Sequence, residues 1–118
     1  HVVFFVDDAD GVDLERLRPL IENDPLFPQR VNVNIASVHD GAIRLRVWER
    51  GVGLTRACGT GACATAVAAI QRHLVQRPVE VRLPGGSLTV DWEPGGRIRM
   101  SGPATHVFTG EIDLETLE

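Results

Sequence analysis

Short segments of alternating or consecutive apolar residues run through most of the chain, with turn residues between them. Residues 43–49 alternate with a period of two, which places Ile43, Leu45 and Val47 on one side of a strand and polar or large side chains on the other. Asp40-Gly41, just before this segment, is a hairpin signal. The same reasoning predicts further strands at Val2–Val6, Val31–Val38, Val79–Leu83, Leu88–Trp92, Ile98–Met100 and His106–Thr109.

One segment departs from this pattern. From Thr60 to about Gln76 the chain is rich in alanine and carries no charge before Arg72. Such a segment is typical of a thin helix that is buried on most of its surface. An amphipathic helix is also predicted for Asp13–Asn23, with Asp10 or Asp13 as its cap. A buried helix among many short strands indicates an α+β (α/β) fold in which a curved, mostly antiparallel sheet wraps around the central helix.

Composition narrows the class of protein. A length of 118 residues with 43% apolar residues and a net charge of −4 is typical of one soluble globular domain. No basic cluster indicates a nucleic-acid partner, and no apolar run is long enough to cross a membrane. The two cysteines, Cys58 and Cys63, are predicted to face different sides of a helix, so we expect neither a disulfide nor a metal site. Free thiols fit a reducing cytoplasm.

Cys58 is the first candidate for chemistry, because it directly precedes Gly59-Thr60-Gly61 at the start of the long helix. The free N–H groups and the dipole of a helix N-terminus favour negative charge and lower the pKa of a thiol. Glycines on both sides of Thr60 would let a ligand carboxylate approach those N–H groups. Cys63 lies inside the helix and is interpreted as a small buried apolar residue.

Five polar residues occupy positions that their place in a strand or at the chain start does not fully explain. Asn32 and Asn34 lie on one face of a predicted strand, although asparagine is depleted in strands. They either bond to backbone at a sheet edge or contact a ligand, and Asn32 is the stronger candidate. Glu49 and Arg50 end a strand, where charges are ordinarily solvated. His1, before the first strand, is ordinarily interpreted as a frayed end.

Four segments together resemble the second half of the diaminopimelate epimerase family. They are His1, as the last residue of a Gly-x-Pro-His motif, Phe27–Asn34, Glu49-Arg50-Gly51 and Ala57–Cys63. The resemblance runs from His1 to about Gly110. It implies that residues 1–118 form a single domain, the C-terminal lobe of a two-lobed enzyme whose N-terminal lobe is absent from this chain.

The resemblance also implies an activity and a set of site residues. The family works without a cofactor and interconverts the LL and meso forms of diaminopimelate, in lysine and peptidoglycan precursor biosynthesis. Cys58 would be one of two acid/base cysteines, Glu49 would orient or deprotonate it, and His1 would be linked to the thiol of the other lobe. The substrate would be held by residues from three segments, namely Asn32, Glu49, Arg50, Gly59 and Thr60.

Three other interpretations are compatible with parts of the sequence. A proline racemase type of enzyme shares the Cys-Gly-Thr-Gly pattern, but the Glu49-Arg50 pair argues against it. The isolated lobe would alternatively bind substrate without turnover, or pair with a second copy through the apolar surface that normally faces the other lobe. A thiol redox module is disfavoured, because the chain has no Cys-x-x-Cys motif.

Overall fold

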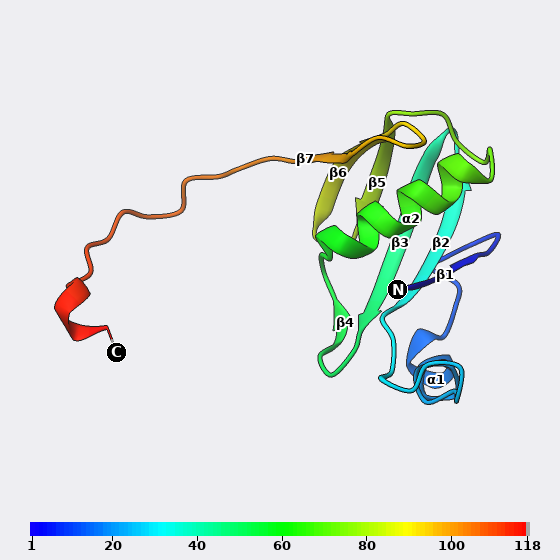
Figure 1. The fold of residues 1–118 in the computed structure, drawn as a ribbon, viewed down its shortest axis with the longest axis horizontal. Coiled ribbons are helices and arrows are strands. Elements are labelled where there is room, and N and C mark those ends of the chain that lie inside the picture. Colours follow the sequence, from blue (N-terminus) through cyan, green and yellow to red (C-terminus); the bar gives the residue numbers. More distant parts are fainter. Residues whose placement is uncertain (118) are drawn as a thin grey trace.

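The computed structural model describes residues 1–117, which form one seven-stranded sheet with a helix on each face (Figure 1). The strands are β1 (Val2–Phe5), β2 (Val33–His39), β3 (Ala42–Glu49), β4 (Gly53–Thr55), β5 (Val79–Leu83), β6 (Gly86–Trp92) and β7 (Ile98–Ser101). The helices are α1 (Leu14–Glu22) and α2 (Gly59–Gln71), and Leu114–Thr116 adds a short 3₁₀ turn. The strand order is β1-β2-β3-β5-β6-β7, with β4 paired to β3.

The sheet is mostly antiparallel, as expected. Antiparallel pairing joins β2 to β3, β3 to β4, β5 to β6 and β6 to β7. Parallel pairing joins β1 to β2 and β3 to β5. The β2–β3 pair is the hairpin predicted from Asp40-Gly41, and both turn residues have the positive φ that its geometry requires. The predicted α+β architecture is therefore confirmed.

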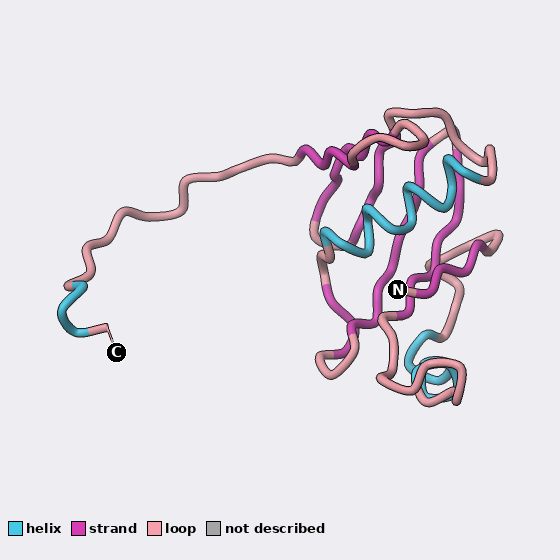
Figure 2. Tube along the Cα trace, viewed as in Figure 1, coloured by secondary structure: helices cyan, strands magenta, loops and turns pink. Residues whose placement is uncertain are grey.

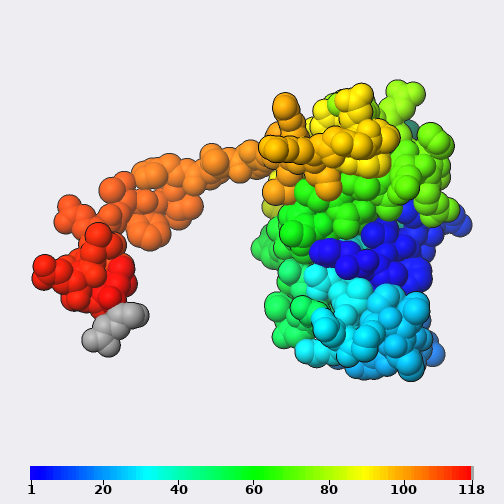
Figure 3. Space-filling view, in the orientation of Figure 1, coloured from blue at the N-terminus to red at the C-terminus, as the bar shows by residue number. Residues whose placement is uncertain are grey.

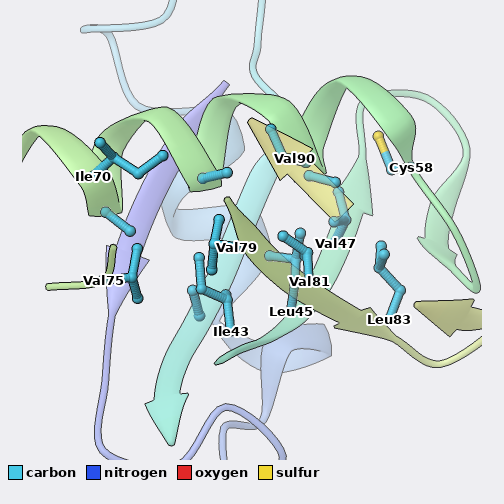
Figure 4. Close-up of a cluster of buried hydrophobic side chains, with 14 residues drawn as sticks. Ile43, Leu45, Val47, Cys58, Ile70, Val75, Val79, Val81, Leu83 and Val90 are labelled. Carbon is cyan, nitrogen blue, oxygen red and sulfur yellow. The ribbon is translucent and has the colours of Figure 1, made fainter. Parts of the chain in front are cut away.

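Helix α2 packs across one face of the sheet and contacts β1, β2, β3, β5, β6 and β7. The period-two prediction for β3 is confirmed, since Ile43, Leu45 and Val47 are buried beneath this helix (Figure 4). The alanines of α2 let the backbone approach the sheet closely, so Ala62, Ala66 and Ala69 are fully buried. Each buried valine, leucine or isoleucine contributes about 1.5–3 kcal/mol.

The sheet curves past α2 without closing around it, and only Thr60 and Gln71 of this helix are exposed, so the expectation of a helix buried on most of its surface is confirmed. The residues of α2 that face away from the sheet are only partly buried, and they are small and apolar: Cys63, Ala64, Val67 and Ala68. A helix covered by one curved sheet keeps one side outside that sheet, whatever its composition.

Helix α1 lies on the opposite face, over a second core that includes Leu14, Val33 and Ile35. The Asp13 side chain caps this helix by accepting from the Arg16 N–H at 3.2 Å, so the prediction of a capped helix is confirmed. The arginines of β3 point to this face. Arg46 donates to the carbonyls of Ala9 and Val12, at 3.0 and 2.7 Å, and thereby holds the segment before α1.

Three boundaries differ from the sequence predictions. Helix α2 ends at Gln71 instead of near Gln76, because the chain turns at His73, which has a φ of 58°. Strand β4 (Gly53–Thr55), which pairs with the end of β3, was not predicted from the sequence. The predicted strand His106–Thr109 is wrong: residues 102–113 form an extended segment outside the body, as Figures 2 and 3 show. That segment has no neighbouring strand within residues 1–117, and an unpaired segment does not form a sheet ladder.

Candidate functional site

The first turn of α2 carries the candidate thiol. Cys58 is the N-cap residue, with an extended backbone (φ −148°, ψ 103°), and its Sγ accepts from the Gly61 N–H at 3.4 Å. The Thr60 hydroxyl lies 3.6 Å from the same sulfur. Only 6% of Cys58 is exposed, at the end of the core under α2 (Figure 4). The predicted position of Cys58 at the helix N-terminus is confirmed.

A cavity of about 610 Å³ opens beside this thiol. Its walls come from Glu49 at the end of β3, from Cys58, Gly59 and Thr60, and from the next turn of α2. Two half-exposed apolar residues of β7, Ile98 and Met100, close the far side. An atom added at Cβ of Gly59 would lie 3.1 Å from Cε of Met100, so glycine brings the backbone of α2 against this wall.

His1 lies against the same helix end. Its Nε2 is 3.0 Å from the Thr60 hydroxyl, and its Nδ1 is 3.1 Å from Nδ2 of Asn34. Parallel pairing of β1 with β2 brings the start of the chain to this position, beside α2 in Figure 3. The structure therefore gives His1 defined partners, and the interpretation as a frayed end is wrong.

Asn32 connects the ends of two strands. Its Oδ1 accepts from the Arg50 N–H at 2.7 Å, and its Nδ2 is 3.5 Å from Nε2 of His1. The Arg50 guanidinium donates to the carbonyl of Gln29 at 3.0 Å and is absent from the cavity wall. The Asn32 side chain thus contacts His1 at the site, whereas Arg50 is held to Asn32 only by its backbone N–H.

The predicted site residues therefore come together in two connected groups. Asn32, His1, Thr60 and Cys58 follow one another in this order, with contacts of 3.5, 3.0 and 3.6 Å between neighbours. Glu49 and Gly59 line the cavity with Cys58 and Thr60. No group of three or more His, Cys, Asp or Glu side chains suited to a metal ion occurs within residues 1–117. Neither helix in that part of the chain is long and apolar enough to cross a membrane.

Cys63 differs from its prediction. It is partly exposed and lines the same cavity as Cys58, although it was expected to be buried and to face elsewhere. Burial of its sulfur, followed by the neighbouring charge of Cys58, raises the pKa of the Cys63 thiol. The cavity thus contains two free thiols, one supplied with hydrogen-bond donors and one held in the neutral form.

Sequence reasoning missed parts of the site. Asn34 was the weaker candidate of the two asparagines, yet it is fully buried, and its Nδ2 lies 2.9 Å from the Val2 carbonyl and 3.1 Å from Nδ1 of His1. Gly61 is required because a Cβ there would lie 2.6 Å from Oδ1 of Asn34. Ile98 and Met100 carried no signal, since their role depends on where β7 crosses the helix end.

Comparison with known proteins identifies the family. A family model described as diaminopimelate epimerase matches residues 1–107. The chain belongs to the diaminopimelate epimerase family. A relative named diaminopimelate epimerase from Rhizorhabdus wittichii is 70% identical over 115 residues, which are 97% of this chain and 42% of the relative. One from Sphingopyxis alaskensis is 65% identical over 96% of the chain and 42% of the relative. The chain thus spans about 42% of the length of these epimerase-family relatives.

Solved structures agree at the level of the fold. A phenazine biosynthesis protein of the PhzF family from Enterococcus faecalis matches 77% of this chain and 33% of its own length, with a TM-score of 0.56 and 14% identity. A PhzF-family protein from Bacillus anthracis matches 83% of this chain and 33% of its own, with a TM-score of 0.56 and 21% identity. This chain and these proteins therefore share a fold.

Proposed function

We propose that this chain supplies one half of the active site of a diaminopimelate epimerase, which interconverts LL- and meso-diaminopimelate without a cofactor. The observation that carries the proposal is the Cys58 thiol at the start of α2, with the Gly61 N–H at 3.4 Å, the Thr60 hydroxyl at 3.6 Å and an open cavity beside it. Family membership supplies the substrate class through the names of the relatives.

Inversion at an amino-acid α-carbon needs a base on one face and an acid on the other. In this proposal the Cys58 thiolate takes the proton from the α-carbon and becomes a thiol, while an acid outside this chain protonates the opposite face. The reverse reaction exchanges these roles. The second acid would be a cysteine in the remaining part of the protein, which corresponds to the length of the relatives that this chain does not span.

The α-proton is weakly acidic, so negative charge that develops at the α-carboxylate must be stabilised. The first N–H groups of a helix have no partner within the helix, and those of Gly59 and Thr60 would hold that carboxylate. Glu49 lines the same cavity, where it would orient or deprotonate Cys58. Asn32 and Arg50 would bind the substrate's other charged groups, with the Arg50 guanidinium leaving the Gln29 carbonyl.

The relatives allow a direct test. A chimera in which this chain replaces the matching 115 residues of the Rhizorhabdus wittichii relative should convert LL- into meso-diaminopimelate. Cys58→Ala should lower kcat by about a thousandfold, because the acid/base group is lost. Cys63→Ala is the matched control, since it removes a thiol from the same cavity, and it should keep most of the activity. Equal losses in the two variants would contradict the assignment of Cys58.

A second experiment addresses the chain by itself, which we expect not to be an epimerase. In deuterated buffer, Cys58 would exchange the α-proton of LL-diaminopimelate only from one face, with retention of configuration. Sustained formation of the meso isomer by the 118 residues alone would contradict the two-lobed mechanism. A reducing cytoplasm remains the proposed location, because both thiols are free. Pairing of two copies remains a prediction.

A further inference from the structure

We propose that Asn34 is a positioning residue of this site: its amide holds His1 in the tautomer that directs the Thr60 hydroxyl proton toward the sulfur of Cys58. The importance of this arrangement for catalysis rests on the proposed function. The arrangement itself depends on contacts among four side chains, and measurements that do not require epimerase activity can detect it.

The orientation of the Asn34 amide follows from its surroundings. Its Nδ2 lies 2.9 Å from the carbonyl oxygen of Val2 and 3.4 Å from that of Asn32. Carbonyl oxygens only accept hydrogen bonds, so the nitrogen of the amide, and not its oxygen, must face them. The third atom near Nδ2 is Nδ1 of His1, at 3.1 Å. An amide NH2 has two hydrogens, and the two shortest contacts, to the Val2 carbonyl at 2.9 Å and to this ring nitrogen at 3.1 Å, take them. Nδ1 of His1 therefore accepts a hydrogen bond and is unprotonated.

An imidazole whose Nδ1 accepts carries its proton on Nε2 when neutral. Nε2 of His1 is 3.0 Å from the Thr60 hydroxyl oxygen, so it donates there. The contact of 3.5 Å between Nε2 and Nδ2 of Asn32 is then no hydrogen bond, because both nitrogens are donors. The proton on Nε2 is therefore given to the shorter contact, with the Thr60 hydroxyl. The longer contact with Asn32 would open when a substrate binds Asn32.

The Thr60 hydroxyl links His1 to Cys58. Because the hydroxyl oxygen accepts from His1, its own hydrogen is available to the sulfur 3.6 Å away. Cys58 then has two donors, the Thr60 hydroxyl and the Gly61 N–H. In the opposite tautomer of His1, an unprotonated Nε2 would draw the Thr60 hydrogen to itself and leave the sulfur with one donor. The Asn34 amide selects between these two arrangements.

Asn34 lies at a position where an amide is unfavourable for stability. The side chain is fully buried at the end of an apolar core, and its Oδ1 has no partner among residues 1–117. An unpaired buried oxygen is unfavourable, and the next residue on the same strand face is Ala36. Gly61 leaves the space that the amide needs, since a Cβ there would lie 2.6 Å from Oδ1. An apolar residue would fill this place with less cost to stability, but it would not orient His1.

The tautomer is measurable by ¹⁵N NMR of the imidazole nitrogens in the 118-residue chain, with the His1 signals assigned by a His1→Gln variant. We expect a protonated Nε2 and an unprotonated Nδ1. Asn34→Asp has the same shape but only accepts, so it should protonate Nδ1. Asn34→Leu removes the donor without adding an acceptor and should give a mixture of tautomers. A wild-type His1 with its proton on Nδ1, or a tautomer unchanged in both variants, would overturn the proposal.

Alkylation gives a second readout, with Cys63 as a control in the same molecule. Asn34→Leu and Thr60→Val should each slow the reaction of Cys58 with iodoacetamide at neutral pH by about two- to threefold. That is the loss of one hydrogen bond to a thiolate, partly offset by its higher intrinsic nucleophilicity. The rate at Cys63 should not change. Equal slowing at both cysteines, or none at Cys58, would contradict the proposal. An inactive chimera with the expected tautomer and alkylation rates would instead reject the proposed function alone.

Discussion

Cys58, at the start of α2, and Cys63, one turn further along, line the same cavity under opposite conditions. Cys58 is the more buried of the two, yet it accepts a hydrogen bond from the Gly61 N–H and lies beside the Thr60 hydroxyl. Cys63 is more exposed, yet burial of its sulfur and the charge of Cys58 raise the pKa of its thiol. The comparison teaches that the exposure of the whole residue does not set the chemistry of a thiol: donors at the helix end face the Cys58 sulfur, whereas burial of the sulfur and the neighbouring charge keep the Cys63 thiol protonated.

Filling the tight space around the first turn of α2 should have the largest effect on stability. Gly61→Ala should lower the free energy of unfolding by about 2 kcal/mol, because overpacking outweighs the gain in helix propensity. The new Cβ would lie 2.6 Å from Oδ1 of Asn34 and 3.2 Å from the Cys58 sulfur. Urea unfolding measures this change.

Gly59→Ala is the matched control in the same turn. Its Cβ would meet only the end of the flexible Met100 side chain, at 3.1 Å, so the unfolding free energy should change by less than about 0.5 kcal/mol. Equal destabilisation by the two substitutions would mean that Asn34 does not constrain the helix end.

Alkylation across pH tests the comparison of the thiols directly. At neutral pH, iodoacetamide should label Cys58 about tenfold faster than Cys63, since only the thiolate reacts. A raised pKa keeps the Cys63 thiol protonated at neutral pH, so its labelling should increase only above the range of an ordinary thiol. In a Cys58→Ser variant the negative neighbour is gone, so the labelling curve of Cys63 should move to lower pH. Faster labelling of Cys63 at neutral pH would reverse the assignment of roles.

Buried hydroxyls on the two sides of the sheet extend the comparison, since the Ser37 hydroxyl has a hydrogen-bond partner and the Thr65 hydroxyl has none among residues 1–117. Thr65→Val should raise the free energy of unfolding by about 1 kcal/mol, because the fully buried Oγ1 of Thr65 has no partner among residues 1–117. Ser37→Ala should lower it by about 1 kcal/mol, because the Ser37 hydroxyl accepts from the Ala9 N–H at 3.1 Å. Changes of the same sign in thermal or urea unfolding would contradict this reading.

The smallest expected difference within a pair of variants is the one between the two cysteines as structural residues. Cys58→Ala removes the acceptor that caps α2 and should cost about 1 kcal/mol of unfolding free energy. Cys63→Ala should change it by less than about 0.5 kcal/mol, because the side chain is partly exposed and alanine favours the helix. A larger loss of unfolding free energy in Cys63→Ala than in Cys58→Ala would contradict this prediction and show that packing of Cys63 stabilises the protein more than the cap.

Much of the fold was predictable from local pattern. Alternation over residues 43–49 identified the buried side of β3, Asp13 marked the start of α1, and the glycines after Cys58 marked the start of α2. The residues of the candidate site that belong to sequence motifs were also predictable, and three of them, His1, Asn32 and Thr60, do lie together. The segment at His106–Thr109 has the apolar pattern of a strand but no partner, and pattern alone does not supply one.

By itself, therefore, the sequence determined the periodicity of the strands, the capped helix ends and the family, because each depends on residues close together in the chain or on specific motifs. Only the tertiary structure decided that Cys63 shares the cavity of Cys58, because the sheet covers α2 from one side. It also decided that Asn34 orients His1. Those residues are 33 positions apart, and the register of β1 on β2 brings them within 3.1 Å. Contacts across such a register depend on the whole sheet, so no local pattern encodes them.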